Sequence, residues 1–362
     1  MAVFEIISGW SLKGHGLRAP TTATRGRICE KSWLTMAQMI VAVSDSVFPN
    51  LDLARGVVSQ VGAELRMASQ PTPEGIVAVA READALLVTY AKITADMIRE
   101  MKRCRIISRF GIGVDNVDIA AATAAGIVVT KVPDYCIDEV SDHAMALLLS
   151  LVRKIPFSNA RAHAGKWEMP AVVPIHRLRG TLLGLVGFGR IPQLVAPKAK
   201  AFGMRVVTYD PYVPQTVLDQ AGVERVEFGE LVRMSDYISI HTPLLPETRH
   251  LFNEQVFRQM KPGAVLVNTS RGPVVDEAAL ARALDAGQLA GAALDVLEQE
   301  PPVSSPLFGR DNVILTPHTS FYSVEALEEL QTKAAEEVVR VLSGQPPRNP
   351  VNPEALKTVR RS

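Results

Sequence analysis

The sequence predicts an α/β protein with two parallel sheets, each covered by helices on both faces. Short apolar runs typical of strands alternate with helical segments along most of the chain, and the alternation starts again after residue 181. This spacing is the pattern of βαβ units, in which a crossover helix follows each strand. One such unit, residues 181–210, has glycines at the turn from strand to helix. We therefore expect two doubly wound parallel-sheet domains, one flavodoxin-like and one of the Rossmann type, with a cleft between them.

Composition and charge are those of an ordinary globular protein with room for two domains. The 362 residues are 47% hydrophobic and 21% charged, and 39 basic side chains balance 38 acidic ones to leave a net charge of +1. No global field favours nucleic acid or an anionic membrane, and no apolar run approaches the roughly 18 residues of a membrane span. The three cysteines lack C-x-x-C spacing. We expect a cytoplasmic protein with no metal site and no disulfide framework.

Residues 1–35 differ from the rest of the chain, because basic residues lie among Ser, Thr and Gly with only two acids. A transit peptide has this composition, but no long apolar segment or helical face supports one. We expect a disordered extension, or a protein that starts at Met36, shortly before the first strand. No C-terminal regulatory domain, and hence no feedback through one, is expected after residue 362.

The first domain is expected over residues 36–135, with residues 319–355 returning to it. Its first strand ends in S-D-S-V-F-P, which lacks glycine, so this domain is not expected to bind a dinucleotide. Ser323–Leu342 has the pattern of a long amphipathic helix that packs back on the first half. Strands are predicted from Met39 and at 65–68, 85–90 and 105–109.

The second domain is expected over residues 136–318. Its first segment, residues 137–153, is apolar around much of its circumference, which indicates a helix buried in a core or against a second subunit. Beyond residue 210, strands are predicted at 223–226, 237–240, 264–268, 290–294 and 312–316.

The glycines of the 181–210 unit lie in G-L-V-G-F-G-R-I. Gly187 allows a tight turn after the strand, and Gly189 lets the backbone come close to a pyrophosphate. The amides of Arg190 and Ile191 would then open the helix and point at that anion. The turn therefore predicts a dinucleotide site.

An acid at the end of the next strand indicates which dinucleotide is bound. Asp210 lies 23 residues after Gly187, where a carboxylate accepts hydrogen bonds from the adenosine ribose. No arginine follows it to accommodate a 2′-phosphate, so we expect NAD rather than NADP. Asp210 also fits the start of a D-P-Y turn, and the two roles are compatible.

Two prolines depart from the dinucleotide pattern. Pro192 stands where the third glycine of G-x-G-x-x-G is expected, but proline is tolerated in the first turn of a helix. Pro197 removes the helical hydrogen bond to Gln193 and should kink the helix, at a cost of roughly 3 kcal/mol if unrelieved. We expect the helix to bend and the anion site to survive.

A second pair of glycines, Gly111 and Gly113, follows an apolar strand in R-F-G-I-G-V-D-N-V-D. Glycine lets consecutive amides turn toward an anion. A plain strand-to-helix turn capped by Asp115 explains the stretch equally well, so both interpretations stand at this point.

Three polar residues each lie just past an apolar strand, where open α/β sheets place their ligands. They are Arg271 in V-N-T-S-R-G, Glu300 in D-V-L-E-Q-E-P-P and His318 in L-T-P-H-T-S. Such a set suits oxidation and reduction at a hydroxyl-bearing carbon. Histidine exchanges the hydroxyl proton, glutamate orients and stabilises the imidazolium, and arginine binds a carboxylate and polarises the carbonyl.

Several longer motifs accompany these residues: R-F-G-I-G-V-D-N-V-D, G-L-V-G-F-G-R-I followed by Y-D-P-Y, H-T-P-L-L-P-E-T, M-K-P-G-A-V-L-V-N-T-S-R-G-P-V-V-D-E-A-A-L, A-L-D-V-L-E-Q-E-P-P and T-P-H. With them, residues 36–352 resemble the D-isomer-specific 2-hydroxyacid dehydrogenases. V-P-D-Y-C-I-D-E-V-S-D-H and H-T-S-F-Y-S are most similar to the C-terminal-binding-protein-like branch, which is close to phosphoglycerate dehydrogenases.

The resemblance implies roles for individual residues. Arg271, Glu300 and His318 would be the catalytic triad, and the backbone of Ile112, Gly113 and Val114 would hold the substrate carboxylate together with Arg271. The residues implied to contact NAD are Gly187, Gly189, Arg190, Ile191, Asp210, Thr242, Pro243, Thr248, Thr269, Ser270, Arg271, Asp295 and His318. Asp295 would lie near the nicotinamide amide.

The implied activity is the NAD-dependent interconversion of a D-2-hydroxy acid and its 2-keto acid, in a homodimer formed through residues 137–153. Since some members of the resembling branch are corepressors that assemble on NADH, an NADH-sensing binding protein is the alternative. A phosphite-oxidising enzyme is a third option. The intact Arg271, Glu300 and His318 set favours the dehydrogenase, whose particular 2-keto acid the sequence does not identify.

Overall fold

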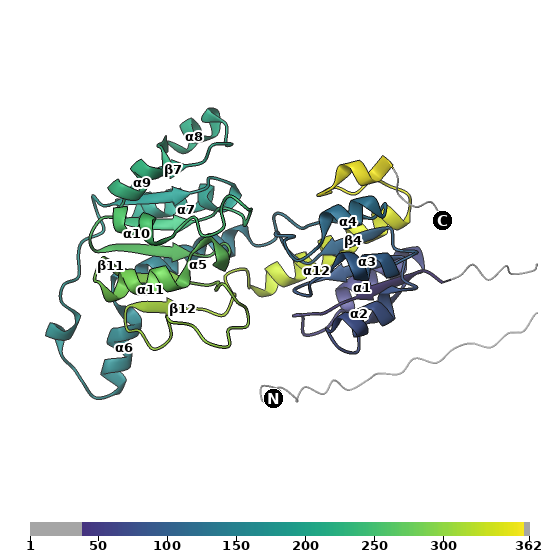
Figure 1. Ribbon diagram of the computed structural model, residues 1–362, viewed down its shortest axis with the longest axis horizontal. Helices are drawn as coiled ribbons and strands as arrows, with labels where there is room; N and C mark the ends of the chain where they lie inside the picture. Colours follow the sequence, from purple (N-terminus) through teal and green to yellow (C-terminus); the bar gives the residue numbers. More distant parts are fainter. Residues whose placement is uncertain (1–37, 358–362) are drawn as a thin grey trace, which may run out of the picture. The chain divides into compact units, whose positions relative to one another are not determined.

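The computed structural model describes residues 38–357, so the extension expected over residues 1–35 lies outside the described residues. Two parallel sheets account for all of the strands, one of five and one of seven. Helices separate the strands along the chain (Figure 1). The predicted fold class, two doubly wound α/β domains, is confirmed.

The five-stranded sheet has the order β2-β1-β3-β4-β5, and every neighbouring pair is parallel. Its inner strands are almost entirely apolar and buried, because helices cover both faces. The strand order reverses between β1 and β3, the place where such sheets bind ligands. The strands are β1 (Ile40–Val43), β2 (Glu64–Met67), β3 (Ala85–Val88), β4 (Ile106–Arg109) and β5 (Val128–Thr130).

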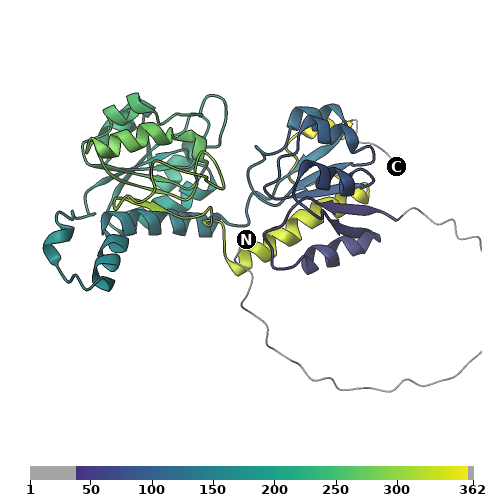
Figure 2. The same cartoon turned by 60° about the horizontal axis from the view of Figure 1, so that its bottom comes forward.

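The last long helix, α12 (Val324–Leu342), packs on α1 and β4 of this sheet. Both views show it lying along α1 (Figures 1 and 2). The buried amide of Gln331 joins the two helices, accepting from the Ala54 N–H at 2.8 Å and donating to the Asn50 carbonyl at 3.0 Å. The domain boundaries given above stay a prediction. The other helical segments here are α1 (Asp52–Val58), η1 (Ser59–Val61), α2 (Pro73–Ala80), α3 (Ala95–Glu100), α4 (Ile119–Ala124) and η4 (Pro353–Lys357).

The seven-stranded sheet has the order β12-β11-β10-β9-β6-β7-β8 and is parallel throughout. Its order reverses between β6 and β9. The strand expected at 223–226 is only two residues long. The strands are β6 (Leu182–Val186), β7 (Arg205–Tyr209), β8 (Glu224–Arg225), β9 (Tyr237–Ile240), β10 (Ala264–Asn268), β11 (Leu289–Leu294) and β12 (Val313–Leu315).

Helices form two layers on this second sheet. Helices α5 (Ile137–Val152) and α7 (Arg190–Ala201) pack together on one face, and α9 (Phe228–Met234), α10 (Glu254–Gln259) and α11 (Glu277–Asp285) cover the other. The apolar side of α5 contacts α7, β10 and β11, so much of its apolar surface is used inside this chain. The remaining helical segments are α6 (Ile155–His163), η2 (Met169–Val172), α8 (Gln215–Ala221) and η3 (Gly272–Val274).

Helix α7 contains both prolines that depart from the dinucleotide pattern. Pro192 is the third residue of the helix and is buried, at a place where its missing N–H has no intrahelical acceptor. Pro197 lies on the exposed side, and the helix runs from Arg190 to Ala201 without interruption. The helix therefore tolerates Pro197, and the expected bend stays a prediction.

The segment from α6 to η2 extends away from the seven-stranded sheet in both views (Figures 1 and 2). It exposes large apolar side chains: Trp167 is 91% exposed and Met169 73%, with Ile155 and Val173 more than half exposed. We call residues 155–173 the exposed arm. Within residues 38–357, no helix is both long and apolar enough to cross a membrane.

Candidate functional site

The turn after β6 has the backbone that its glycines predict. Gly187 adopts φ +94°, and a Cβ there would lie 2.9 Å from the His241 carbonyl oxygen, so both conformation and space require glycine. Gly189 is the N-cap of α7, with an extended backbone. Nothing lies within 4 Å of the position that its Cβ would take. The turn thus leaves open space in front of the first amides of α7, as an anion site requires.

Asp210 ties this turn to the end of β7. One carboxylate oxygen accepts a hydrogen bond from the Phe188 amide at 2.7 Å, and the other accepts from the amides of Tyr212 and Val213 at 2.8 and 3.1 Å. The predicted turn role is therefore present. The ribose contact is compatible with it and stays a prediction.

The loops after β9 and β10 lie next to this turn. Ser270 Oγ donates to the Thr242 carbonyl, which links the two loops. Thr248 Oγ1 donates to the Pro243 carbonyl at 2.7 Å and accepts from the Leu245 amide, closing the loop after β9. Thr269 Oγ1 is buried and has no hydrogen-bond partner in the described chain. An orphaned hydroxyl beside an open helix N-terminus fits a polar cofactor.

His318 and Glu300 form a direct pair. His318 Nδ1 lies 2.5 Å from Glu300 Oε2, and the other carboxylate oxygen accepts from the Leu297 amide at 2.9 Å. A carboxylate can only accept when ionised, so Nδ1 carries the proton of this bond. Nε2 has no hydrogen bond within residues 38–357 and can exchange a proton with a ligand.

Asp295 holds the loop that carries His318. Its side chain is completely buried. The carboxylate accepts from Thr316 Oγ1 at 2.5 Å and from the amides of Thr319 and Ser320, both at 2.9 Å. His318 has φ +52°, a conformation that costs a non-glycine residue about 1–3 kcal/mol. These bonds therefore keep the histidine in a conformation that it would otherwise leave. The nicotinamide contact implied for Asp295 stays a prediction.

Arg271 is oriented by two contacts. Nε donates to Asp115 Oδ1 at 3.0 Å, and Nη1 donates to the Ser270 carbonyl at 2.8 Å. Burial raises the pKa of Asp115, but Arg271 outweighs it, and the net effect is a lowered pKa. Nη2 lies against Gly113, where a Cβ would come within 1.7 Å of it. Within residues 38–357, Nη2 therefore has no hydrogen bond and lies beside the 112–114 backbone.

The structure tests the capping role considered for Asp115, whereas the anion-binding interpretation of the glycine stretch stays a prediction. The N-cap of α4 is Asp118, whose carboxylate accepts from the Ala121 amide at 2.9 Å. Capping by Asp115 was therefore wrong. Its carboxylate instead accepts a hydrogen bond from Arg271 Nε.

A cavity of about 540 Å³ joins the loops of both sheets. Among the predicted site residues, those that line it are Ile112, Gly113, Val114, Ile191, Pro243, Thr269, Ser270, Arg271 and His318. Glu300 does not line the cavity, but it contacts His318, which does. The others that do not line it are Gly187, Gly189, Arg190, Asp210, Thr242, Thr248 and Asp295. The structure thus brings two members of the predicted triad to one cavity and places the third behind the histidine.

Aromatic side chains also line this cavity. Phe321, which the sequence left open between a pocket wall and core packing, lines it, and so does Tyr90, which sequence reasoning did not single out. Tyr90 and Phe321 lie edge-on to the ring of His318, with ring centroids 5.7 and 6.1 Å away. Tyr90 is presented by the loop after β3, whose amides donate to the Asp45 carboxylate. Arg109 also lines the cavity. Tyr90 could have been identified only from its place in the loop after β3, where the strand order of the first sheet reverses. Arg109 is the first residue of the R-F-G-I-G-V-D-N-V-D motif.

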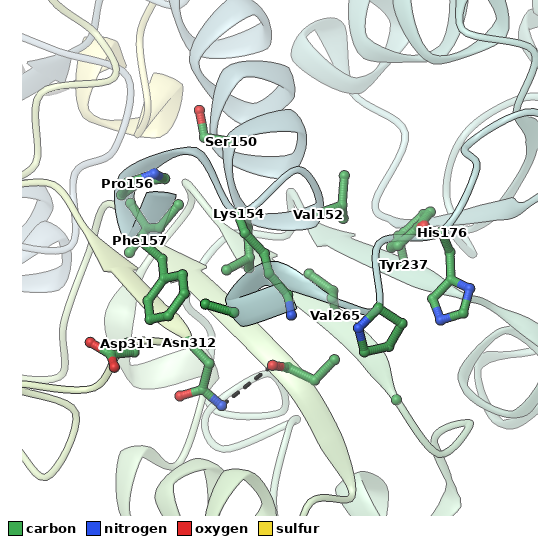
Figure 3. Close-up of a pocket in the computed structure, with 16 residues that line it drawn as sticks. Ser150, Val152, Lys154, Pro156, Phe157, His176, Tyr237, Val265, Asp311 and Asn312 are labelled. Atoms are coloured by element: carbon green, nitrogen blue, oxygen red, sulfur yellow. Dashed lines mark hydrogen bonds between the residues drawn. The ribbon is translucent and has the colours of Figure 1, made fainter. Parts of the chain in front are cut away.

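A second cavity of about 250 Å³ lies where α5 ends and the exposed arm begins. Figure 3 shows the side chains of Lys154, Phe157 and Asn312 turned toward one another around it. Asn312 Nδ2 donates to the Ala290 carbonyl at 3.3 Å. No cluster of three or more metal-binding side chains occurs in residues 38–357.

Comparison with known proteins gives the site its context. The model of the family described as "D-isomer specific 2-hydroxyacid dehydrogenase, NAD binding domain" matches residues 145–320. That segment contains the glycine turn, Arg271, Glu300 and His318. It therefore binds NAD, and the open helix end, Asp210 and the orphaned Thr269 hydroxyl fit that cofactor.

Relatives extend the similarity beyond that domain. A D-3-phosphoglycerate dehydrogenase of Methanocaldococcus jannaschii is 41% identical over 82% of this chain and 56% of its own length, so the chain spans about half of that relative. A glyoxylate reductase of Thermococcus litoralis is 39% identical over 76% of this chain and 86% of its own length. A structure of D-lactate dehydrogenase from Aquifex aeolicus, complexed with NAD and lactic acid, has a TM-score of 0.76 at 28% identity. It covers 89% of this chain and 100% of that one.

The glyoxylate reductase match covers most of both chains at an identity that implies common descent, and both sheets have the topology predicted for the resemblance. The chain belongs to the D-isomer-specific 2-hydroxyacid dehydrogenases.

Proposed function

We propose that this protein is an NAD-dependent oxidoreductase that interconverts a D-2-hydroxy acid and its 2-keto acid. The observation that carries the proposal is the His318–Glu300 pair at 2.5 Å, with His318 facing the same cavity as Arg271. An acid–base group and a carboxylate-binding cation at one cavity, beside an NAD-binding domain, are the groups that this reaction needs.

Arg271 and the 112–114 backbone would bind the substrate. The free Nη2 group and the neighbouring amides can take the carboxylate, and the guanidinium also polarises the adjacent carbonyl. Asp115 keeps the guanidinium plane in place. The substrate is thereby fixed with its C2 oxygen toward His318.

His318 would move the proton. In the direction of reduction, protonated Nε2 donates to the C2 oxygen as the alkoxide forms, and Nδ1 stays bound to Glu300, which stabilises the imidazolium. In oxidation the neutral ring takes the proton back. The bound cofactor would supply the hydride chemistry, from NADH to C2 in reduction and from C2 to NAD⁺ in oxidation. Tyr90 and Phe321 pack against the ring and limit its orientation.

The cofactor would be held by the groups around the glycine turn. The amides of Arg190 and Ile191 face the pyrophosphate position next to Gly189, and Asp210 accepts from the ribose. Thr242, Pro243, Thr248, Thr269 and Ser270 form the facing wall, and the Thr269 hydroxyl gains a partner there. Isothermal titration with NADH tests this part, and absence of binding at millimolar ligand would contradict it.

A screen of 2-keto acids tests the activity. We expect NADH consumption with at least one acid of a panel that includes glyoxylate, hydroxypyruvate, 3-phosphohydroxypyruvate and a branched 2-keto acid, using the full chain. If every acid is inert while NADH binds and promotes capture of a partner protein, the NADH-sensing alternative is favoured instead.

We further propose that the protein is a cytoplasmic homodimer. The exposed arm carries Trp167, Met169, Ile155 and Val173, all more than half exposed, and contiguous exposed apolar side chains mark interaction surfaces. The resemblance implies that a second copy of the chain covers such a surface. The apolar side of α5 packs largely against other helices and strands of its own chain. The dimer contact would then lie on the arm rather than on α5 alone.

A further inference from the structure

Two glutamates, Glu277 and Glu298, hold each other's backbone behind the Glu300–His318 pair. Glu277 is the first residue of α11, and its N–H donates to Glu298 Oε1 at 2.9 Å. In return, the Glu298 N–H donates to Glu277 Oε1 at 2.5 Å. Glu277 is buried, and its second carboxylate oxygen accepts from Ser305 Oγ at 2.7 Å. These reciprocal bonds join the start of α11 to the loop after β11.

This loop supports the carboxylate of Glu300. The Leu297 N–H, directly before Glu298, donates to Glu300 Oε1 at 2.9 Å. The other Glu300 oxygen lies 2.5 Å from His318 Nδ1. The distance from Glu300 to the histidine therefore depends on where the backbone of Leu297 and Glu298 lies.

The same backbone packs against the segment that follows Arg271. A Cβ at Gly272 would lie 1.9 Å from the Leu297 carbonyl oxygen and 2.6 Å from the Glu298 nitrogen, so the two segments touch directly. Gly272 opens η3, and α11 follows shortly after it. The bonds between Glu277 and Glu298 therefore close a ring of chain that includes both Arg271 and the Glu300 loop.

His250 holds the Glu298 side chain from a third segment. Its Nε2 lies 2.9 Å from Glu298 Oε2. His250 has φ +50°, a left-handed conformation that a residue with a side chain adopts only when its surroundings impose it. Its N–H donates to the Pro273 carbonyl at 2.8 Å, and its carbonyl accepts from Asn253 Nδ2 at 3.1 Å. Strain of this kind is concentrated at functional sites.

None of these three residues lines the cavity that Arg271 and His318 share. Glu277, Glu298 and His250 therefore act on a substrate there only through other residues. The residue that they reach most directly is Glu300, through the backbone of the loop after β11.

We propose that Glu298 is a positioning residue that keeps the Glu300 carboxylate aligned with His318 Nδ1. Glu277 and His250 keep the Glu298 side chain in place. This inference rests on the proposed function and adds a positioning residue to it. Without the Glu298 side chain, the Glu277 N–H loses its acceptor and the loop is released from α11 at that point.

The proposal predicts a larger effect on proton transfer than on substrate binding. Arg271 keeps its own bonds to Asp115 and to the Ser270 carbonyl when Glu298 is changed. The substrate carboxylate would then still be bound, whereas the acid–base pair would be misaligned. In kinetic terms, kcat should fall and KM should stay nearly constant.

Glu298→Ala and Glu298→Gln form the test pair. With the best 2-keto acid of the panel, alanine should lower kcat roughly 10- to 100-fold, because a displacement of about 1 Å can cost that much. KM and NADH affinity should change by less than about threefold. Glutamine can still accept from the Glu277 N–H and donate to neutral His250, so it should restore most of kcat. Glu254→Ala removes an acid with two ion pairs on α10 and α11 and is the matched control, with wild-type kcat expected.

A double variant separates positioning from a merely structural role. If Glu298 acts through Glu300, Glu298→Ala should cost less than about threefold in kcat when Glu300→Ala is already present, because residues that act as a unit have non-additive effects. A structural role would give the same factor in both backgrounds.

Three kinetic results would overturn the inference. Unchanged kcat in Glu298→Ala would mean that Glu300 needs no support from this side chain. A rise in KM alone would mean that the bonds serve Arg271 instead. Equal losses with and without Glu300 would mean that Glu298 acts independently of it.

His250→Asn replaces Glu298→Ala if the alanine variant does not fold. Asparagine tolerates the left-handed backbone but is too short to reach Glu298 as the imidazole does. Its kcat should fall by a smaller factor, and only while Glu300 is present. Wild-type kcat in folded His250→Asn would then contradict the proposal.

Proton NMR keeps the inference testable if the proposed function fails. A short histidine–carboxylate hydrogen bond gives a proton resonance far downfield, and the resonance of His318 Nδ1 is identified by its disappearance in Glu300→Ala. We expect it in the wild type and in Glu298→Gln, and we expect Glu298→Ala to shift or abolish it. If the wild type reduces no 2-keto acid, the proposed function fails, but these spectra still decide whether Glu298 positions Glu300. An unchanged resonance in Glu298→Ala, or none in the wild type, would overturn the inference.

Discussion

Replacing Asp295 by asparagine should loosen the loop that presents His318. The carboxylate accepts three hydrogen bonds, from Thr316 Oγ1 and from the amides of Thr319 and Ser320, in a fully buried place. Asparagine keeps the shape but offers one acceptor oxygen and turns an NH₂ group toward a donor. At least one buried amide is then left unpaired.

The structure gives the expected size of the effect. An unpaired buried donor costs about 1–3 kcal/mol, and the lost bond to a charged group is at the upper end of that range. We therefore expect the free energy of unfolding to fall by about 2–4 kcal/mol. His318 would also relax from φ +52°. Since a displacement of about 1 Å can cost roughly 100-fold in rate, kcat should fall by about that factor.

Urea unfolding and NADH-consumption kinetics measure the two effects of Asp295→Asn. Thr316→Val is the control, because it removes one hydroxyl donor and should cost only about 1 kcal/mol. If NADH affinity is unchanged, Asp295 acts only by holding the loop that carries His318. If NADH affinity is weaker, Asp295 also makes the nicotinamide contact that the resemblance implies. Wild-type stability together with wild-type kcat would refute the reasoning.

Two further changes test the cofactor turn and the dimer. Gly189→Val should weaken NADH binding roughly 10- to 100-fold in a titration, because the valine side chain would enter the space in front of α7. The free energy of unfolding should change little, since the backbone at Gly189 has a conformation that any residue adopts. Full NADH affinity in this variant would argue against the anion site. Trp167→Asp should lower the molar mass measured by light scattering from that of two chains to that of one. Tyr212→Ala, which removes another highly exposed aromatic side chain outside the arm, should not. A wild-type monomer would contradict the dimer proposal.

The fold could be predicted because its determinants are local and repeated. Apolar strands and intervening helices fix the two sheets, and the turn at Gly187 needs a conformation that only glycine adopts easily. The groups at strand ends were predictable for the same reason, since parallel strands end at one edge of a sheet. His318 and Glu300 follow from that rule.

Long-range partners could not be predicted in the same way. The Asp115–Arg271 bond joins residues far apart in sequence, and spacing along the chain carries no information about it. Local turn chemistry allowed Asp115 as a cap, whereas Asp118 caps the helix in the structure. Arg109 resembles any strand-end arginine in sequence, and only burial without a partner sets it apart.

His318→Ala tests the central claim most directly. NADH consumption with the best 2-keto acid should be abolished, because we propose that Nε2 delivers the proton to the substrate oxygen while Nδ1 stays bound to Glu300. NADH binding, measured by titration on the same preparation, should stay close to that of the wild type. Full residual activity in this variant would contradict the account.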